Sequence, residues 1–158
     1  MVIQRWQSVY LFIATVLMAV YAFLPIAVFF VGNESYEFTT LGVECINAPE
    51  EVGYEIAIVT WPLFVVEMLV AAISLITIFK FKKLRLQKTL CAICIIMALA
   101  LIVSLAIMAY NITMIQGYSG MRFYMANCLP LLCVILYAMA MHGISKDQKV
   151  LRSYDRIR

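Results

Sequence analysis

Charged residues are scarce in this 158-residue chain: Lys, Arg, Asp and Glu together make up 13% of it, whereas 65% is hydrophobic. Soluble domains carry about 25% charged and roughly 45–50% apolar residues. So few charges cannot cover a water-facing surface, which excludes an ordinary soluble domain. The net charge of +3 says nothing about nucleic acid, and no nucleic-acid partner is predicted.

Residues that build most catalytic and metal sites are also few. The chain has one histidine, His142, and it lacks a glycine-rich phosphate loop, a nucleophile beside a base and a metalloprotease helix. A lone histidine near a helix end is more often a hydrogen-bonding group than a metal ligand. We therefore predict that the protein is not an enzyme and uses no metal and no cofactor.

What the chain does have is four long apolar runs, at about residues 8–31, 56–79, 89–112 and 123–144. A helix needs about 20 apolar residues to cross the hydrocarbon core of a bilayer, whereas a barrel strand needs only roughly 9–11. The first run is too long for a cleavable signal peptide, so we expect a retained anchor. The predicted fold is all-α: one domain, a four-helix transmembrane bundle.

Charge placement predicts the orientation of this bundle. Eleven of the twelve basic residues lie before the first run, in the link 80–88 or in the tail 145–158, and only Arg122 lies elsewhere. The loop 32–55 holds six glutamates and no Lys or Arg. Because basic residues in short loops stay cytoplasmic, both termini are predicted to be cytoplasmic and loop 32–55 to be an acidic outer loop.

Glu67 is the one ionisable residue deep inside a predicted span. Thr60, Glu67 and Ser74 are seven residues apart, which places them on one helix face as a polar stripe turned toward the neighbouring helices. The third predicted span offers Ser104 and Asn111, and the first offers Ser8 and Thr15. Two interpretations stay open: Glu67 fixes the packing by an interhelical hydrogen bond, or it serves a proton, ion or substrate site.

The cysteines favour packing over chemistry. Cys91 and Cys94 have redox spacing but lie at the predicted cytoplasmic start of the third span, where thiols are kept reduced. The outer loops offer only Cys45, whereas a disulfide-generating enzyme needs a pair there. A bridge from Cys45 to Cys128 stays open as an alternative.

Prolines and loops add local expectations. Pro25, Pro62 and Pro130 fall in the outer halves of predicted spans, where each is compatible with a kink or with an ordinary membrane helix. Residues 36–45 of the outer loop alternate in a way that is compatible with a short hairpin.

The tail carries an amphipathic pattern. Read as a helix, it places Val150, Leu151, Tyr154 and Ile157 on one side and basic residues on another. Such a helix suits either the anionic headgroups of the cytoplasmic leaflet or a docking partner. The residues predicted to form a cytoplasmic docking surface are Lys82, Lys83, Arg85, Lys149, Arg152, Asp155, Arg156 and Arg158.

Three segments together resemble one known family: the start MVIQRWQS, the link FKKLRLQ with Cys91, and the tail SKDQKVLRSYDRIR. They are similar to the family called domain of unknown function 4293, small four-span proteins of Bacteroidota. The resemblance implies a bacterial inner (cytoplasmic) membrane location and no particular activity.

Two functions compete, and a third is set aside. The first is a non-enzymatic accessory or scaffold subunit that docks a larger membrane complex through its basic cytoplasmic surface. The alternative is a small proton-coupled transporter or channel-like carrier that uses Glu67. A junction tetraspan of the animal type would need a cysteine pair and a tryptophan in the outer loop, where Cys45 stands alone.

Overall fold

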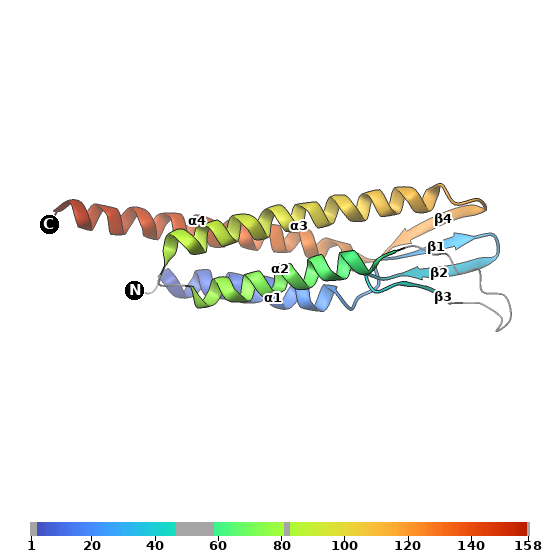
Figure 1. Ribbon diagram of the computed structural model, residues 1–158, viewed down its shortest axis with the longest axis horizontal. Coiled ribbons are helices and arrows are strands. Elements are labelled where there is room, and N and C mark those ends of the chain that lie inside the picture. The colour runs from blue at the N-terminus through green and yellow to red at the C-terminus, as the bar shows by residue number, and fades with distance from the viewer. Residues whose placement is uncertain (1–2, 47–58, 81–82, 158) are drawn as a thin grey trace.

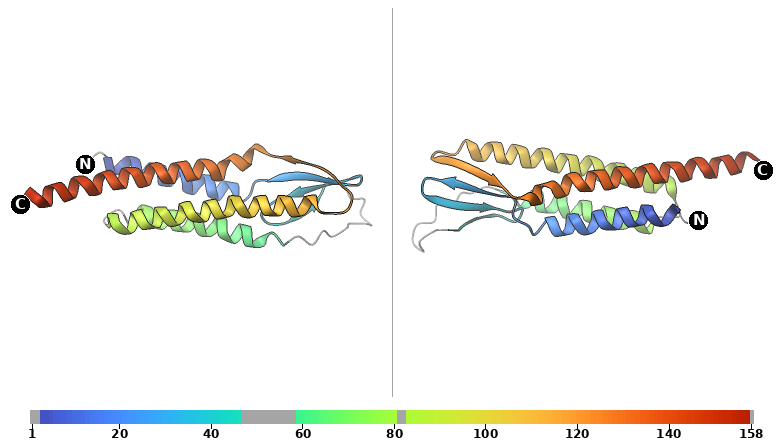
Figure 2. Two further views of the ribbon diagram at one scale, coloured as in Figure 1. Left: turned by 90° about the horizontal axis from the view of Figure 1, so that it is seen from above. Right: turned by 180° about the vertical axis from the view of Figure 1, so that it is seen from behind.

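Four helices run side by side along the long axis of the molecule, and a small sheet stands at one end of them (Figure 1). The computed structural model describes residues 3–46, 59–80 and 83–157, with backbone only for 3–5, 151–152 and 154–157. The helices are α1 (Ile3–Tyr21), α2 (Trp61–Phe79), α3 (Leu84–Thr113) and α4 (Cys128–Ile157), with a 3-10 turn, η1 (Met125–Asn127), before α4. We call the end that carries the sheet the sheet end, and the end where both termini lie the basic end (Figures 1 and 2).

Three helices are long and apolar enough to cross a membrane: Trp61–Phe79, Leu84–Thr113 and Met125–Val150. The apolar part of the remaining helix, Trp6–Tyr21, is shorter. Each helix buries a narrow face of residues spaced three or four apart, such as Leu11, Ala14 and Met18 of α1. Large apolar side chains such as Ile96 and Leu131 are exposed on the opposite faces, as expected for helices surrounded by lipid.

The sheet contradicts the all-α prediction. Four antiparallel strands are present in the order β3 (Val43–Cys45), β2 (Glu34–Phe38), β1 (Ala27–Val31) and β4 (Tyr118–Phe123). The predicted hairpin within 36–45 is confirmed as β2 and β3. The α1–α2 connection supplies β1, β2 and β3 and the α3–α4 connection supplies β4, so the sheet ties the two connections together.

The prediction of a helical span over residues 8–31 is therefore wrong at its C-terminal end. Helix α1 stops at Tyr21, because the residue before Pro25 is pushed out of helical geometry. The following run AVFFV is rich in β-branched and aromatic residues and forms β1. Gly32 has a φ of 61° at the two-residue turn into β2, a conformation that glycine adopts without strain.

The other predicted boundaries also shift. Pro62 lies in the first turn of α2, where a missing N–H costs nothing, so this helix begins at Trp61 rather than at residue 56. Helix α3 begins five residues before the predicted span, and α4 begins at Cys128 after β4 and η1 rather than at 123. Pro130 lies in the first turn of α4 and Pro25 lies between α1 and β1, so none of the three prolines kinks a helix interior.

Candidate functional site

The polar stripe of α2 faces the bundle interior, as the spacing predicted. Thr60, Glu67 and Ser74 are all buried, and Thr77 extends the same face toward the basic end. The Thr15 hydroxyl of α1 donates to the Ser74 hydroxyl at 2.8 Å, and Ser74 in turn donates to the Leu11 carbonyl at 3.3 Å. The interhelical hydrogen bond expected for this stripe is thus made by Ser74.

Glu67 is fully buried in the protein, although it lies close to the start of α2. Its side chain is 0% exposed, yet it stands only six residues after the start of α2, about 9 Å along the axis. The predicted position at the middle of a span was wrong because α2 starts later than predicted. Neither carboxyl oxygen has a hydrogen-bond partner among the described residues, so the interhelical bond proposed for Glu67 is not made within this part of the chain.

Two hydroxyl groups stand close to this carboxyl. Tyr21, at the end of α1, interacts with it electrostatically, and Thr40 reaches it from the turn between β2 and β3. The Thr40 hydroxyl donates its single proton to the Ala22 carbonyl at 2.8 Å, so it offers Glu67 only lone pairs. This turn closes the sheet end of the bundle above Glu67.

Tyr21 connects this group to Asn127 in η1. The Tyr21 hydroxyl donates to the Asn127 amide oxygen at 3.1 Å, and the Asn127 amide nitrogen donates to the Ile26 carbonyl at 2.8 Å. Sequence analysis missed Tyr21, Thr40 and Asn127. The only available signal was that each is a polar residue beside the end of an apolar run, and many residues at membrane boundaries share that property.

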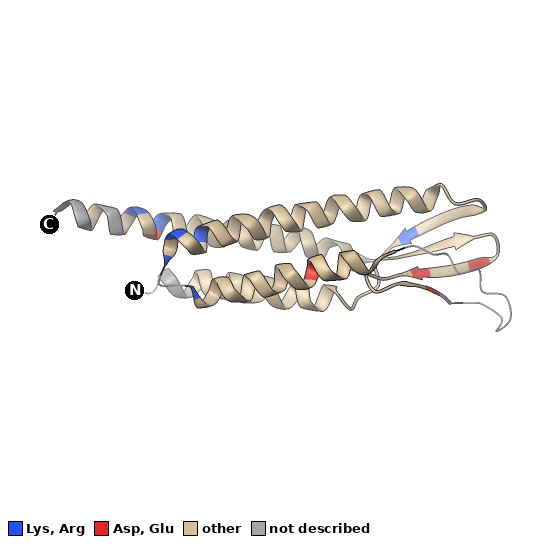
Figure 3. Cartoon of the chain, in the orientation of Figure 1, with Lys and Arg blue, Asp and Glu red and all other residues tan. Residues whose placement is uncertain are grey.

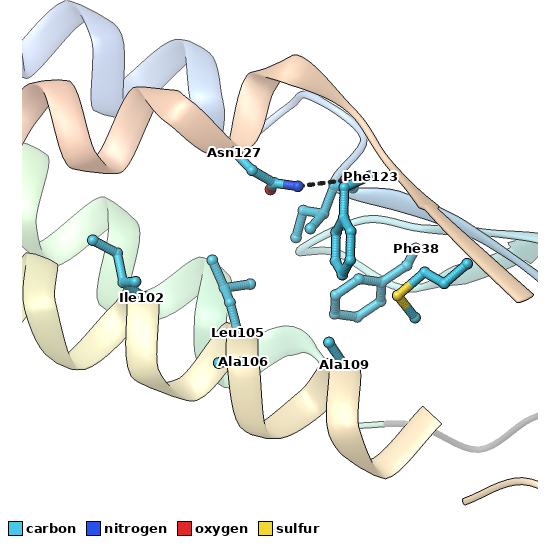
Figure 4. Close-up of a pocket in the computed structure, with 9 residues that line it drawn as sticks. Phe38, Ile102, Leu105, Ala106, Ala109, Phe123 and Asn127 are labelled. Atoms are coloured by element: carbon cyan, nitrogen blue, oxygen red, sulfur yellow. Dashed lines mark hydrogen bonds between the residues drawn. The ribbon is translucent and has the colours of Figure 1, made fainter. Parts of the chain in front are cut away.

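Asn127 also lines an apolar cleft between α3 and the sheet, about 260 Å³ in volume (Figure 4). Helix α3 contributes Ile102, Leu105, Ala106 and Ala109. The sheet and its flanks contribute Ile26, Phe38, Met121, Phe123 and Asn127. The cleft is thus lined by apolar side chains and a single amide.

The remaining predicted polar residues do not join Glu67. Ser104 donates to the Leu101 carbonyl of its own helix at 2.7 Å, and Asn111 is exposed near the end of α3. His142 is exposed on α4. Of the predicted intramembrane polar site, Thr60, Glu67 and Ser74 share the buried face of α2, whereas Ser104 and Asn111 lie apart from it on α3.

The cysteines are buried packing residues or free thiols. Cys91, Cys94 and Cys133 are fully buried near Tyr137, and the Cys133 thiol contacts the Ala14 carbonyl at 3.6 Å. Cys45 and Cys128 are both free, so the alternative bridge between them is not formed. Within the described ranges no group of three or more His, Cys, Asp or Glu residues could hold a metal ion.

The charges separate toward the two ends (Figure 3). Lys83, Arg85 and Lys149 of the predicted docking surface are exposed at the basic end. The backbone of α4 carries Arg152, Asp155 and Arg156 beyond them, whereas Lys82 and Arg158 lie outside the described residues. At the sheet end, Glu37 accepts a hydrogen bond from the Tyr124 hydroxyl at 3.2 Å.

A family model described as Domain of unknown function (DUF4293) matches residues 3–157. The chain belongs to this family. None of the curated proteins compared matches it.

In this DUF4293 protein, the described parts of the three segments that carry the resemblance gather at one place. The start of α1, the start of α3 and the last turns of α4 all lie at the basic end (Figures 1 and 3). The Gln7 amide of α1 donates to the Asp147 carboxylate of α4 at 2.7 Å, which joins the first segment to the third.

Proposed function

We propose that this protein is a non-enzymatic accessory subunit of a bacterial inner-membrane complex, with the basic end in the cytoplasm. In this proposal all four helices cross the bilayer, and both termini are cytoplasmic. The separation of basic and acidic residues toward opposite ends supports this orientation, because Lys and Arg in short segments are retained on the cytoplasmic side.

The observation that carries the proposal is the projection of α4 beyond the bundle. Gln7 is hydrogen-bonded to Asp147, so these two residues lie at the same level of the bundle. Beyond that level α4 has ten helical residues, whereas α1 has only the four before Gln7. The difference of six residues makes α4 extend about 9 Å past the start of α1. Figure 1 shows this last part standing clear of the other helices.

This geometry favours one of the two roles considered for the tail. A helix that lies on the membrane surface has to turn away from the span before it. Here residues 145–157 continue α4 as one helix from Cys128, which supports a tail that leaves the bilayer along the axis of its span rather than one that lies on the surface. Lys146, Lys149 and Val150 are exposed on this segment, which offers both charge and an apolar side chain to a partner of complementary, acidic surface.

Co-purification tests the proposal. The protein is extracted in mild detergent from its native membrane, with a tag in loop 47–58, and the proteins bound to it are quantified. We expect a stoichiometric partner that is lost when residues 145–158 are deleted and when Lys146 and Lys149 are both changed to Glu. Arg122→Glu, a single charge reversal at the sheet end, is the control for a change of surface charge and should retain the partner. Equal recovery in all variants would refute docking through the basic end.

A second function, proton-coupled transport, is favoured by Glu67 alone. A fully buried carboxyl with no hydrogen-bond partner among the described residues is costly to keep, and such residues within membranes commonly serve transport. Proton-driven flux in liposomes, lost in Glu67→Gln, would establish this role. Unchanged flux in that variant would exclude it.

A further inference from the structure

The cleft between α3 and the sheet lies at the depth where the apolar part of the bundle ends. A hydrocarbon core about 30 Å thick is crossed by roughly 20 helical residues. Counted from Lys88, the last basic residue in the first turns of α3, that length ends near Met108. The cleft residues Ile102, Ala106 and Ala109 therefore span the boundary between hydrocarbon and headgroups at the sheet end.

The cleft opens on the lipid-facing side of the molecule. Two of its lining residues, Ala106 and Phe123, are themselves exposed, and the Phe123 side chain is 62% exposed. Figure 4 shows Leu105 and Ala109 of α3 on one side of the cleft and the rings of Phe123 and Phe38 on the other. The mouth thus lies between α3 and β4, beside the exposed apolar face of α3.

The residues that line the cleft indicate which kind of molecule it binds. Ordered water needs two to four polar partners, and here the amide of Asn127 is the single polar side chain. An unfilled apolar cavity destabilises a protein in proportion to its volume. A flexible hydrocarbon chain needs no polar partners and can fill the apolar space, and lipid surrounds the mouth of the cleft. One of the two Asn127 N–H groups is used by the bond to the Ile26 carbonyl, which leaves the other to donate to an ester carbonyl at the boundary.

We propose that this cleft binds one acyl chain of a phospholipid from the leaflet at the sheet end. The bound chain packs between α3 and the sheet and fills the space that the fold leaves between them. This inference goes beyond the proposed docking at the basic end and does not depend on it.

Photolabelling tests the proposal. The full-length protein is placed in nanodiscs that contain phosphatidylethanolamine with a diazirine at the middle of one acyl chain, and labelled peptides are mapped after illumination. We expect labelling to concentrate on residues 102–109 and 121–127. Ala106→Phe should reduce labelling of these peptides by about tenfold, because a filled cleft excludes the chain. Ala100→Phe, the same change at an exposed position of α3 outside the cleft, should leave the labelling unchanged.

Three outcomes would overturn the inference. The first is wild-type labelling spread evenly over the exposed helix faces, which decides the question even if Ala106→Phe fails to fold. The second is equal labelling in Ala106→Phe and Ala100→Phe. The third is loss of the phospholipid label when a free fatty acid without a diazirine is added, which would assign the cleft to fatty acids.

Discussion

At the residue scale, Glu67 is a buried carboxyl whose neighbouring hydroxyl groups donate their protons to other acceptors. The Thr40 hydroxyl is committed to the Ala22 carbonyl, and the Tyr21 hydroxyl is committed to Asn127. Two nearby donors are therefore occupied, and the carboxyl is left unpaired within the described residues. Such a residue is maintained at a cost to stability, which is the physical reason for considering a functional role.

We expect Glu67→Leu to stabilise the protein by about 1–3 kcal/mol, because the change removes a buried polar group that has no hydrogen-bond partner among the described residues. Thermal unfolding in detergent measures the effect. Glu67→Gln is the control, since it keeps a polar group of the same size and should change stability little. A Leu variant that is clearly less stable than wild type would mean that the carboxyl has a partner in the folded protein.

Tyr124 at the sheet end gives a pH-dependent prediction. Desolvation, together with the hydrogen bond and charge of Glu37, raises the pKa of the Tyr124 hydroxyl above its ordinary value. Because a raised pKa means that the folded state holds the proton more tightly, this contact stabilises fully below about pH 10 and is lost as the pH rises further. Glu37→Gln should lower the pKa of Tyr124 in an NMR titration of ring-labelled tyrosine. Glu34→Gln, on the same strand, should not; an identical titration in both variants would disprove the contact.

At the scale of elements, the bundle is joined by few polar bonds. The Thr15–Ser74 hydrogen bond links α1 to α2, and Gln7–Asp147 links α1 to α4. In membrane proteins such interhelical bonds contribute about 0.6 kcal/mol on average and up to about 1.7 kcal/mol. Close packing of the narrow buried faces must supply most of the remaining association energy.

A double-mutant cycle of Thr15→Ala and Ser74→Ala should give a coupling energy of about 0.6–1.7 kcal/mol, measured by unfolding in mixed micelles. Ser104→Ala is the matched control, because Ser104 bonds only within α3. Paired with Thr15→Ala, it should show no coupling. Additive effects of Thr15→Ala and Ser74→Ala would argue against the α1–α2 bond.

The hairpin of β1 and β2 depends on Gly32. Its φ of 61° is strained for other residues, although nothing lies within 4 Å of an added Cβ. Gly32→Ala should therefore destabilise the sheet by about 1–2 kcal/mol through the backbone alone. Gly42→Ala, which also enters open space but without a positive φ, should have a smaller effect in the same melting experiment. Equal melting temperatures for Gly32→Ala and wild type would contradict the turn geometry.

The sequence could predict helix faces better than helix ends. The seven-residue spacing of Thr60, Glu67 and Ser74 correctly predicted one buried face, because helical periodicity is a local property. Strand β1 was missed, since its short apolar run AVFFV fits a strand or a buried helix equally well. Its partner β4 lies about 90 residues away, so the pairing leaves no local signal. Pro25 and Pro62 were noticed but placed inside predicted spans, as kinks or as ordinary membrane prolines, although they mark the ends of elements.

At the scale of the whole molecule, the two ends differ in chemistry. The sheet end carries glutamates and the apolar cleft, whereas the basic end carries the exposed lysines and the projecting part of α4 (Figures 1 and 3). The described parts of the three segments on which the family resemblance was recognised gather at the basic end. This arrangement supports separate roles for the two ends, with lipid contact at one and partner docking proposed at the other.

Site-specific crosslinking in the native membrane tests the docking proposal most directly. A photoreactive amino acid is introduced at Val150, which is 46% exposed on α4 at the basic end, or at Leu131, which is 55% exposed on the same helix near the sheet end. We predict a discrete protein adduct from position 150 and only lipid adducts from position 131. Lipid adducts alone from both positions, or the same protein adduct from both, would contradict docking through the basic end.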